Sequence, residues 1–176
     1  MAKASDTEAQ ALDIAVLTVS DTRGEAEDTS GKYLVEAAQQ AGHKLAEKAI
    51  VRDDIYQIRA IVSRWIAAAD VDAIVVTGGT GFSGRDSTPE AVEPLFDKRI
   101  EGYGEMFRSL SYEEIGSSTI QSRAVGGLAN DTVIFCIPGS TGACRTAWNG
   151  VIREQLDSSH RPCNFVGVMN VRERES

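Results

Sequence analysis

Residues 75–90 read VVTGGTGFSGRDSTPE, and this stretch decides how the rest of the chain is interpreted. It continues a short apolar run, 71–76, rich in β-branched residues, which is typical of a buried strand. Four glycines follow within positions 78–84, and glycine permits positive φ angles and close approach of a ligand to backbone amides. Residues 88–90 predict a helix start, with Thr88 as its N-cap. A strand, a glycine loop and a helix N-terminus in this order are typical of a phosphate site.

The same stretch can also be a tight connection with no ligand. It lacks the Gly-Lys-Ser/Thr of a P-loop, and its glycines do not have the spacing of the Gly-x-Gly-x-x-Gly dinucleotide fingerprint. Arg85 and Asp86 favour a ligand role, because a plain turn does not need an adjacent cation and anion.

The composition indicates a single soluble domain. The chain has 176 residues, of which 42% are hydrophobic and 25% charged. The net charge of −8 argues against nucleic acid or an anionic membrane as the main partner, and no stretch approaches the roughly 18 apolar residues of a membrane helix. The three cysteines match no metal spacing, and the N-terminus lacks the apolar core of a signal peptide. We therefore expect a cytoplasmic protein with reduced thiols.

Apolar periodicity predicts strands that alternate with helices. The expected strands are 12–19, 45–51, 71–76 and 132–137, with 45–51 at an edge. The expected helices are 30–41, 54–69, 89–96, 104–110, 117–124 and 143–156. This alternation predicts an α/β fold with a mostly parallel sheet covered on both faces. The expected organisation is a disordered lead-in at 1–11, one domain at 12–165 and a tail at 166–176.

Several polar loops are predicted to meet at one rim of this sheet. Ligands of open α/β sheets lie beyond the carboxyl ends of the strands. The loops 20–30, 78–88 and 138–142 each leave such an end, and Asp53 follows another. Two glycine-containing helix starts suggest more than one phosphate, and Asp53 and Asp86 would repel phosphate unless a divalent cation such as Mg²⁺ lay between.

Helix capping is an alternative role for several of these residues, namely Asp28, Ser30, Asp53, Ser140 and Thr141. Capping is the expected role of Ser30. Asp86 is less easily explained in this way, because Thr88 is expected to cap the helix that follows it.

The motifs together resemble those of a known family. The residues that carry the resemblance are LTVSD at 17–21 with EDTSG at 27–31, TGGTG at 77–81 with RDSTPE at 85–90, and PGS at 138–140. In this order they resemble the molybdenum-cofactor biosynthesis proteins of the MoaB/MogA family, which includes the G domain of gephyrin. The resemblance covers about residues 12–165, and the runs 107–124 and 138–148 look like the MoaB branch.

The resemblance implies a three-layer α/β domain that forms a homotrimer or a homohexamer. It implies binding of molybdopterin, a pterin dithiolene with a terminal phosphate. Active members adenylylate that phosphate with Mg-ATP and release pyrophosphate, and the product goes on to molybdate insertion, so a molybdate-insertion protein is an expected partner. Asp86 matches the aspartate that is essential in active members, and Asp53 matches a second aspartate by position.

The resemblance and the rim argument together give each site residue an expected role. Asp86 and Asp53 are the expected ligands of Mg²⁺ and Arg85 stabilises charge at the transferring phosphorus, so these three are the expected catalytic residues. No general base is required, because a phosphate nucleophile is already ionised at neutral pH. The expected substrate-binding residues are Ser20, Asp28, Ser30, Gly78, Gly79, Thr80, Gly81, Thr88, Pro138, Gly139, Ser140 and Thr141.

Two other functions stay open. Thr141 stands where adenylyltransferases of the MogA type usually have proline, and this favours a non-catalytic molybdopterin carrier or scaffold. A nucleotide-binding regulator without a pterin role is the third hypothesis. Inactive relatives lose the Arg-Asp-x-Thr pattern, which this chain keeps at 85–88.

The segment 102–120 predicts an interface between copies of the chain. It carries several large apolar side chains in a stretch too irregular for a core helix, and exposed apolar clusters usually mark interfaces.

Overall fold

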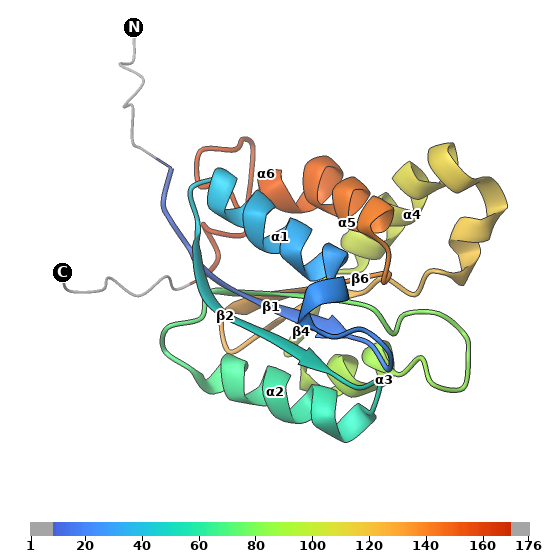
Figure 1. Cartoon of the computed structure of the whole chain (residues 1–176). Helices are drawn as coiled ribbons and strands as arrows, with labels where there is room; N and C mark the ends of the chain where they lie inside the picture. The colour runs from blue at the N-terminus through green and yellow to red at the C-terminus, as the bar shows by residue number, and fades with distance from the viewer. Residues whose placement is uncertain (1–8, 170–176) are drawn as a thin grey trace, which may run out of the picture.

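The structure is a computed structural model that describes residues 9–169, and one central sheet lies between two layers of helices (Figure 1). The expected lead-in 1–11 and tail 166–176 lie largely outside the described residues. The strands are β1 Asp13–Val19, β2 Lys44–Val51, β3 Ala73–Thr77, β4 Lys98–Arg99, β5 Gly126–Ala129 and β6 Thr132–Ile137. Their order is β2-β1-β3-β6-β5-β4, with β2 at one edge as expected.

Four neighbouring strands, β2, β1, β3 and β6, run parallel, and β5 and β4 continue the sheet antiparallel. This confirms the expected α/β class with a mostly parallel sheet. The two antiparallel strands were not predicted. β4 has only two residues, and β5 begins with two glycines, which are poor strand formers. Gly127 is required at its position, because a Cβ there would overlap the ring of Phe96.

The helices are α1 Thr29–Gln40, α2 Ile55–Ala67, α3 Thr88–Val92, α4 Glu101–Ile115, α5 Thr141–Ala147 and α6 Arg153–Gln155. The 3₁₀ turns η1 Glu25–Glu27, η2 Glu93–Leu95 and η3 Gly116–Gln121 supplement them, and the π-helical turn η4 Trp148–Ile152 joins α5 to α6. The helices α1, α2 and the continuous α5–α6 lie within one or two residues of the expected bounds. Gly42, with φ of +90°, lies just beyond α1, where a helix stop was expected.

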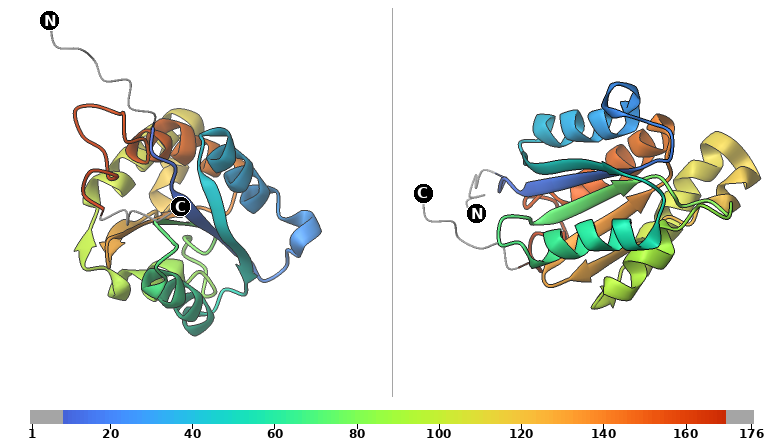
Figure 2. Two further views of the ribbon diagram at one scale, coloured as in Figure 1. Left: turned by 90° about the vertical axis from the view of Figure 1, so that its left-hand side faces the viewer. Right: turned by 60° about the horizontal axis from the view of Figure 1, so that its bottom comes forward.

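Alternate side chains of the strands divide between two cores. On β1, Ile14 and Val16 pack with residues of α1, α4 and α5, whereas Ala15 and Leu17 pack with residues of α2 and α3. This follows from the two-residue period of a strand. Figure 2 shows the same division, with helices on both faces of the twisted sheet. The expected three-layer arrangement is therefore confirmed.

The helix α4 begins earlier and ends later than the expected 104–110. Gly102 and Gly104 weaken the helical signal of its first turns, because glycine has a low helix propensity. Packing overrides that propensity, since Tyr103 and Phe107 are both buried against the sheet. Gly104 also allows a close approach, because a Cβ there would lie 2.5 Å from the carbonyl oxygen of Ala124.

Two expectations from the composition can be compared with the fold. Within residues 9–169, no helix combines the length and the apolar content that a membrane span needs. Cys136 and Cys144 are buried free thiols, and Cys163 is an exposed one.

We predict that the exposed apolar side chains of α4 and η3 mediate self-association. Tyr112 is 57% exposed and Ile120 is 74% exposed, and such side chains are shielded from water when copies associate. Light scattering should give a multiple of the 18.9 kDa chain mass. Tyr112→Asp or Ile120→Asp should lower that mass, whereas Tyr56→Asp, on the exposed face of α2, should not. A parent protein that stays monomeric at micromolar concentration would contradict the prediction.

Candidate functional site

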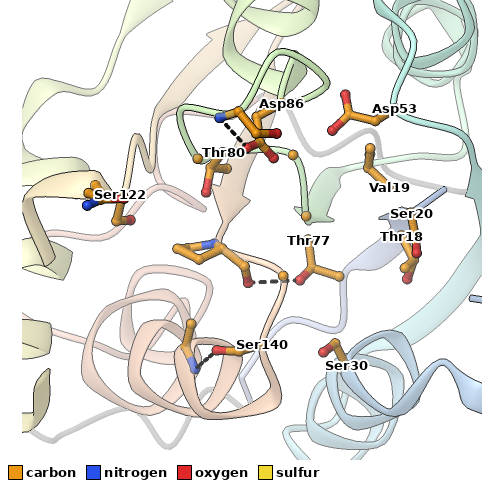
Figure 3. A pocket seen from close by; sticks show the side chains of 18 of the residues that line it. Thr18, Val19, Ser20, Ser30, Asp53, Thr77, Thr80, Asp86, Ser122 and Ser140 are labelled. Atoms are coloured by element: carbon orange, nitrogen blue, oxygen red, sulfur yellow. Dashed lines mark hydrogen bonds between the residues drawn. The ribbon is translucent and has the colours of Figure 1, made fainter. Parts of the chain in front are cut away.

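A cavity of about 610 Å³ lies at the carboxyl ends of the parallel strands (Figure 3). The ends of β1 and β3 line it, together with the loops that follow these strands and β6, and Asp53 joins them from the segment after β2. The polar loops expected on one rim therefore do meet there. The volume is within the range of small-molecule sites, about 300–1,000 Å³.

The glycine loop begins with two residues in the left-handed region. The φ angle is +102° at Gly78 and +69° at Gly79, and residues with a Cβ rarely adopt such angles. Space is also lacking at Gly78, because a Cβ would overlap the carbonyl oxygen of Val19. Gly139 is similarly confined, since its Cβ would lie 3.1 Å from the Cα of Gly78. The loop therefore presents backbone, rather than side chains, to the cavity.

Thr88 does not have the capping role that was expected. Ser87 is the N-cap of α3, and Thr88 is the first residue of the helix. The buried Thr88 hydroxyl donates to the carbonyl oxygen of Gly78 at 2.7 Å, and the Thr88 amide donates to that of Gly79 at 2.9 Å. The loop carbonyls thus engage the side chain that was expected to cap the helix. Thr88 therefore holds the glycine loop through its backbone carbonyls, and it does not line the cavity.

The Asp53 carboxylate lines the cavity and fixes the start of α3. Its Oδ1 accepts hydrogen bonds from the Ser87 amide at 2.9 Å and the Ser87 hydroxyl at 2.5 Å. The N-cap of α2 is Asp54, so the alternative role of Asp53 as that cap is wrong. Burial raises the pKa of Asp53, and the charges of Asp86 and Asp21 add to this, against the opposing effect of the bonds from Ser87.

Asp86 closes the glycine loop on itself. Its Oδ2 accepts from the Ser83 amide at 2.9 Å, and its own amide donates to the Ser83 carbonyl at 3.0 Å. A Cβ at Gly81 would lie 2.7 Å from this Oδ2, so a glycine is needed beneath the carboxylate. The other oxygen, Oδ1, accepts no hydrogen bond from the described residues and is open to a ligand.

Arg85 pairs with Asp21, a site residue that the sequence reasoning missed. Nη2 of Arg85 lies 2.7 Å from Oδ1 of Asp21, and Nε lies 3.0 Å from Oδ2. The hydrogen bond from Arg85 is the main reason that the pKa of Asp21 is lowered. The Arg85 side chain is 65% exposed, so this pair contributes little to folding and can separate readily. The position of Asp21 two residues after the first strand was the available signal.

The start of α5 contributes a second helix N-terminus to the cavity. The Ser140 hydroxyl accepts from the Ala143 amide at 3.0 Å, so Ser140 is the N-cap of α5. Ser140 also lines the cavity, as do Pro138 and Gly139. Figure 3 shows Ser140 and Ser30 on the side of the cavity opposite Asp53 and Asp86. The carboxylates thus face a wall rich in hydroxyl groups.

Ser30 lies in the first turn of α1 and is not its cap. The N-cap is Asp28, whose Oδ1 accepts from the Gly31 amide at 2.9 Å. The hydroxyl of Thr141 lies 3.0 Å from that of Thr29 and 3.4 Å from that of Ser30, which joins the starts of α1 and α5. Ser30 lines the cavity, whereas Thr141 does not.

Asp28 is a buried structural carboxylate away from the cavity wall. Its Oδ2 lies 2.9 Å from the Lys48 ammonium and accepts from the Thr18 hydroxyl at 2.8 Å. Burial acts to raise the pKa of Asp28, but the hydrogen bonds from Lys48, Gly31 and Thr18 outweigh it, and the pKa is lowered. Asp28 therefore holds the start of α1 in place, behind Ser30.

The cavity brings together most of the expected site residues, namely Ser20, Ser30, Asp53, Gly78, Gly79, Thr80, Gly81, Arg85, Asp86, Pro138, Gly139 and Ser140. Three expected residues, Asp28, Thr88 and Thr141, do not line it. A wall formed by α4 and η3 was missed altogether. It consists of Phe107, Ser111, Ile115, Ser118, Gln121 and Ser122. The sequence pointed to this segment through the MoaB-like run 107–124 and through the expected interface at 102–120, but neither indicated that it reaches the rim.

The donor set at the rim suits a hard divalent cation. No group of three or more His, Cys, Asp or Glu side chains within residues 9–169 is placed to hold a metal. Mg²⁺ does not need such a group, because it commonly binds one or two carboxylates together with waters and phosphate oxygens. Asp53 and Asp86 are two carboxylates on one wall, and the charge of Asp86 contributes to the raised pKa of Asp53, so a cation bound there would relieve the repulsion.

Comparison with known proteins identifies the family. The sequence profile described as "Probable molybdopterin binding domain" matches residues 15–158. The chain is 60% identical over 152 residues to the molybdenum cofactor biosynthesis protein B of Escherichia coli K12, covering 86% of this chain and 89% of that one. This chain belongs to the molybdenum-cofactor biosynthesis family. The corresponding protein of Bacillus cereus is 47% identical over 142 residues, covering 80% of this chain and 84% of that one.

Solved structures of the family share the fold. A crystal structure of a molybdenum cofactor biosynthesis protein B superposes with a TM-score of 0.81 at 45% identity, covering 84% of this chain and 92% of that one. The tungsten cofactor synthesizing protein MoaB from Pyrococcus furiosus gives 0.73 at 36% identity, covering 80% and 89%. The expected MoaB/MogA resemblance is therefore confirmed.

We predict that Gly79→Val impairs the site of this family member. The branched side chain would be forced into φ of +69° and would overlap the Thr88 hydroxyl and the Asp53 carboxylate. Unfolding in urea should show a loss of about 1–3 kcal/mol, and calorimetry should show at least tenfold weaker binding of Mg-ATP. Gly84→Val is the control, because nothing lies within 4 Å of its Cβ. If both variants bound as the parent does, the loop would be a plain connection.

We also predict that Lys48→Met destabilises the fold at neutral pH by about 2 kcal/mol, since it leaves the buried Asp28 carboxylate without its cation. A carboxyl whose pKa is lowered by folding stabilises the fold at pH values above its ordinary pKa of 3.8. This stabilisation is lost as the pH falls through the lower pKa that the carboxyl has in the folded protein. Urea unfolding should therefore show a large difference between parent and variant at pH 7 and a smaller one at pH 3. Lys44→Met, exposed on the same strand, should match the parent at both values.

Proposed function

We propose that this protein binds molybdopterin and transfers AMP from ATP to its terminal phosphate. An oxygen of the pterin phosphate attacks the α-phosphorus of ATP, and the bond from this phosphorus to the bridging oxygen breaks, so that pyrophosphate leaves. The observation that carries the proposal is one cavity in which the Asp53 and Asp86 carboxylates and the glycine-loop backbone face the α5 start across the same space.

Backbone amides supply the phosphate-binding groups. The Gly78 amide donates to the Ile137 carbonyl at 2.9 Å and belongs to the sheet. The amides of residues 79–81 donate to no described protein group, so they are open to an anion. On the opposite wall the N-terminus of α5, capped by Ser140, adds the partial positive charge of a helix dipole. Two such binding regions suit a reaction that must hold two phosphorylated substrates close together.

Asp53 and Asp86 are the residues that would hold Mg²⁺. When bound, the ion would neutralise part of the triphosphate charge and so make the α-phosphorus more open to attack by an anion. Without a cation, two carboxylates beside a triphosphate would oppose its binding.

Arg85 supplies a positive charge at the cavity. Its pair with Asp21 lies at the cavity, and both side chains are partly exposed. Exchange of the Asp21 carboxylate for a phosphate oxygen replaces one bidentate hydrogen-bonded pair by another. The guanidinium can then stabilise charge on the phosphoryl group during transfer.

A non-catalytic carrier is the second candidate, and the same pair favours it. Arg85 is bound to Asp21, and Asp86 is bound to the Ser83 amide, so both groups already have protein partners. A carrier would bind molybdopterin and release no pyrophosphate from ATP. Release of pyrophosphate in the presence of molybdopterin distinguishes the two.

The cellular setting follows from the same proposal. An adenylylated pterin phosphate is an activated intermediate, so an enzyme that inserts molybdate must consume it. We propose such a molybdate-insertion protein as the downstream partner, in the cytoplasm.

The test of the enzyme proposal is Asp86→Asn, which keeps the size of the side chain and removes its charge. The rate of AMP transfer from ATP to molybdopterin should fall by roughly a hundredfold or more at saturating Mg²⁺, because one preorganised electrostatic group is lost. Molybdopterin affinity should change little, because we propose that this ligand is held mainly at residues 138–142, on the wall opposite Asp86. Asp70→Asn, exposed in the turn before β3, is the matched control and should behave as the parent.

Equal rates in parent and Asp86→Asn would remove Asp86 from the mechanism. Absence of transfer in the parent, with molybdopterin still bound, would falsify the enzyme proposal and support the carrier.

A further inference from the structure

Arg123 binds the glycine loop at several points, although it lies more than thirty positions away from it in the sequence. Its amide donates to the Thr80 carbonyl at 3.0 Å. Its guanidinium donates from Nε to the Gly81 carbonyl at 2.9 Å and from Nη2 to the Asp86 carbonyl at 3.1 Å. One side chain thus joins the first and last residues of the turn 81–86.

Two further contacts fix the guanidinium itself. It lies over the ring of Phe82, 5.1 Å from the ring centre, and its Nη1 pairs with the Glu90 carboxylate on α3. Burial acts to raise the pKa of Glu90, but the hydrogen bond and the charge of Arg123, together with a hydrogen bond from the Glu90 backbone, outweigh it, and the pKa is lowered. Glu90 is therefore ionised at neutral pH, and the Arg123 side chain, 25% exposed, is held between α3 and the loop.

We propose that Arg123 is a positioning residue for Asp86, which it places by fixing the backbone of residues 80–86. The inference rests on the proposed adenylyl transfer, in which the Asp86 carboxylate acts at the cavity. It concerns a residue that does not line the cavity and acts through the loop carbonyls.

The composition of the loop explains why such an anchor is needed. Residues 81–86 contain Gly81 and Gly84, and residues 82–85 are exposed, so the segment has much conformational freedom and no core contacts to restrict it. The bonds between Asp86 and Ser83 lie within the loop and cannot hold it relative to the sheet. The exposed Arg85–Asp21 pair also joins the loop to the end of β1, but it can separate readily. Arg123, which directly follows Ser122 of the α4–η3 wall, adds several hydrogen bonds to the loop carbonyls. A shift of about 1 Å in a catalytic group can reduce the rate about a hundredfold.

The experiment compares Arg123→Gln and Arg123→Lys with Arg59→Gln as the matched control. Arg59 also donates to backbone carbonyls of α3, those of Glu90 at 2.9 Å and Ala91 at 3.1 Å, but it does not touch the loop. Three experiments and a melting temperature are recorded for each folded variant. The experiments are the kinetics of AMP transfer (kcat and KM), the Mg²⁺ dependence of ATP binding by calorimetry, and the exchange of the Ser83 and Asp86 amide protons by NMR.

In Arg123→Gln, both amide protons should exchange faster than in the parent, and ATP binding should require a higher Mg²⁺ concentration. The kcat for AMP transfer should fall by roughly 10–100-fold, whereas KM for molybdopterin should stay within about threefold of the parent. Arg123→Lys, which keeps the charge and can reach fewer carbonyls, should recover part of the loss. Arg59→Gln should match the parent in the kinetics, the Mg²⁺ dependence and the amide exchange, and only its melting temperature should differ. This pattern separates positioning from a purely structural role, which would lower the melting temperature alone.

Amide exchange in Arg123→Gln equal to that of the parent would overturn the inference, whether or not the parent transfers AMP. Faster exchange with unchanged Mg²⁺ dependence and unchanged kcat would also overturn it, because the loop would then be anchored without effect on Asp86. If the parent transfers no AMP, the enzyme proposal fails, and the exchange and Mg²⁺ measurements still decide the role of Arg123.

Discussion

The close approach of three strand ends at Gly78 is the constraint on which the site depends. The Gly78 amide continues the sheet through its bond to Ile137, and its α-carbon lies against Val19 on one side and Gly139 on the other. Neither space nor φ allows a side chain there. Because β1, β3 and β6 are held this closely, their following loops converge on one cavity, and the glycine loop turns its backbone toward it. The path of the chain thus presents backbone, rather than side chains, at this end of the cavity.

Charge at the rim is then arranged in two layers. Behind the wall, Asp28 is satisfied by Lys48 and two further donors, so its charge stabilises the start of α1 and is not available to a ligand. At the wall, Asp53 has a raised pKa because burial and neighbouring carboxylates disfavour its charge. On the proposed function, this negative charge beside open backbone amides would favour joint binding of Mg²⁺ and phosphate over binding of either alone.

The parallel part of the fold could be predicted from the sequence because three of its four strands, β1, β3 and β6, are short apolar runs buried on both faces. The rim followed from that prediction, since parallel strands end at one edge. The antiparallel strands could not be predicted, because β4 is two residues long and β5 gains its stability from pairing with β6 rather than from its own residues. Capping was predicted wrongly at Thr88 and Ser30 for one physical reason. Short polar side chains bind whichever backbone or side-chain group lies nearest, and the tertiary structure determines that group.

The α4–η3 wall was missed for a related reason, and it shows where members of such a fold can differ. Phe107 and Ser111 reach the cavity only because α4 packs across the antiparallel end of the sheet, with Gly104 against the Ala124 carbonyl. The strand-end loops line the cavity with backbone and carboxylate groups, whereas α4 and η3 line it with apolar and hydroxyl groups. The two parts of the wall come from different regions of the chain, so each can change without the other. On the proposed function, ligand preference could therefore diverge while the strand-end rim is kept, provided that a contact between the two parts preserves their relative position.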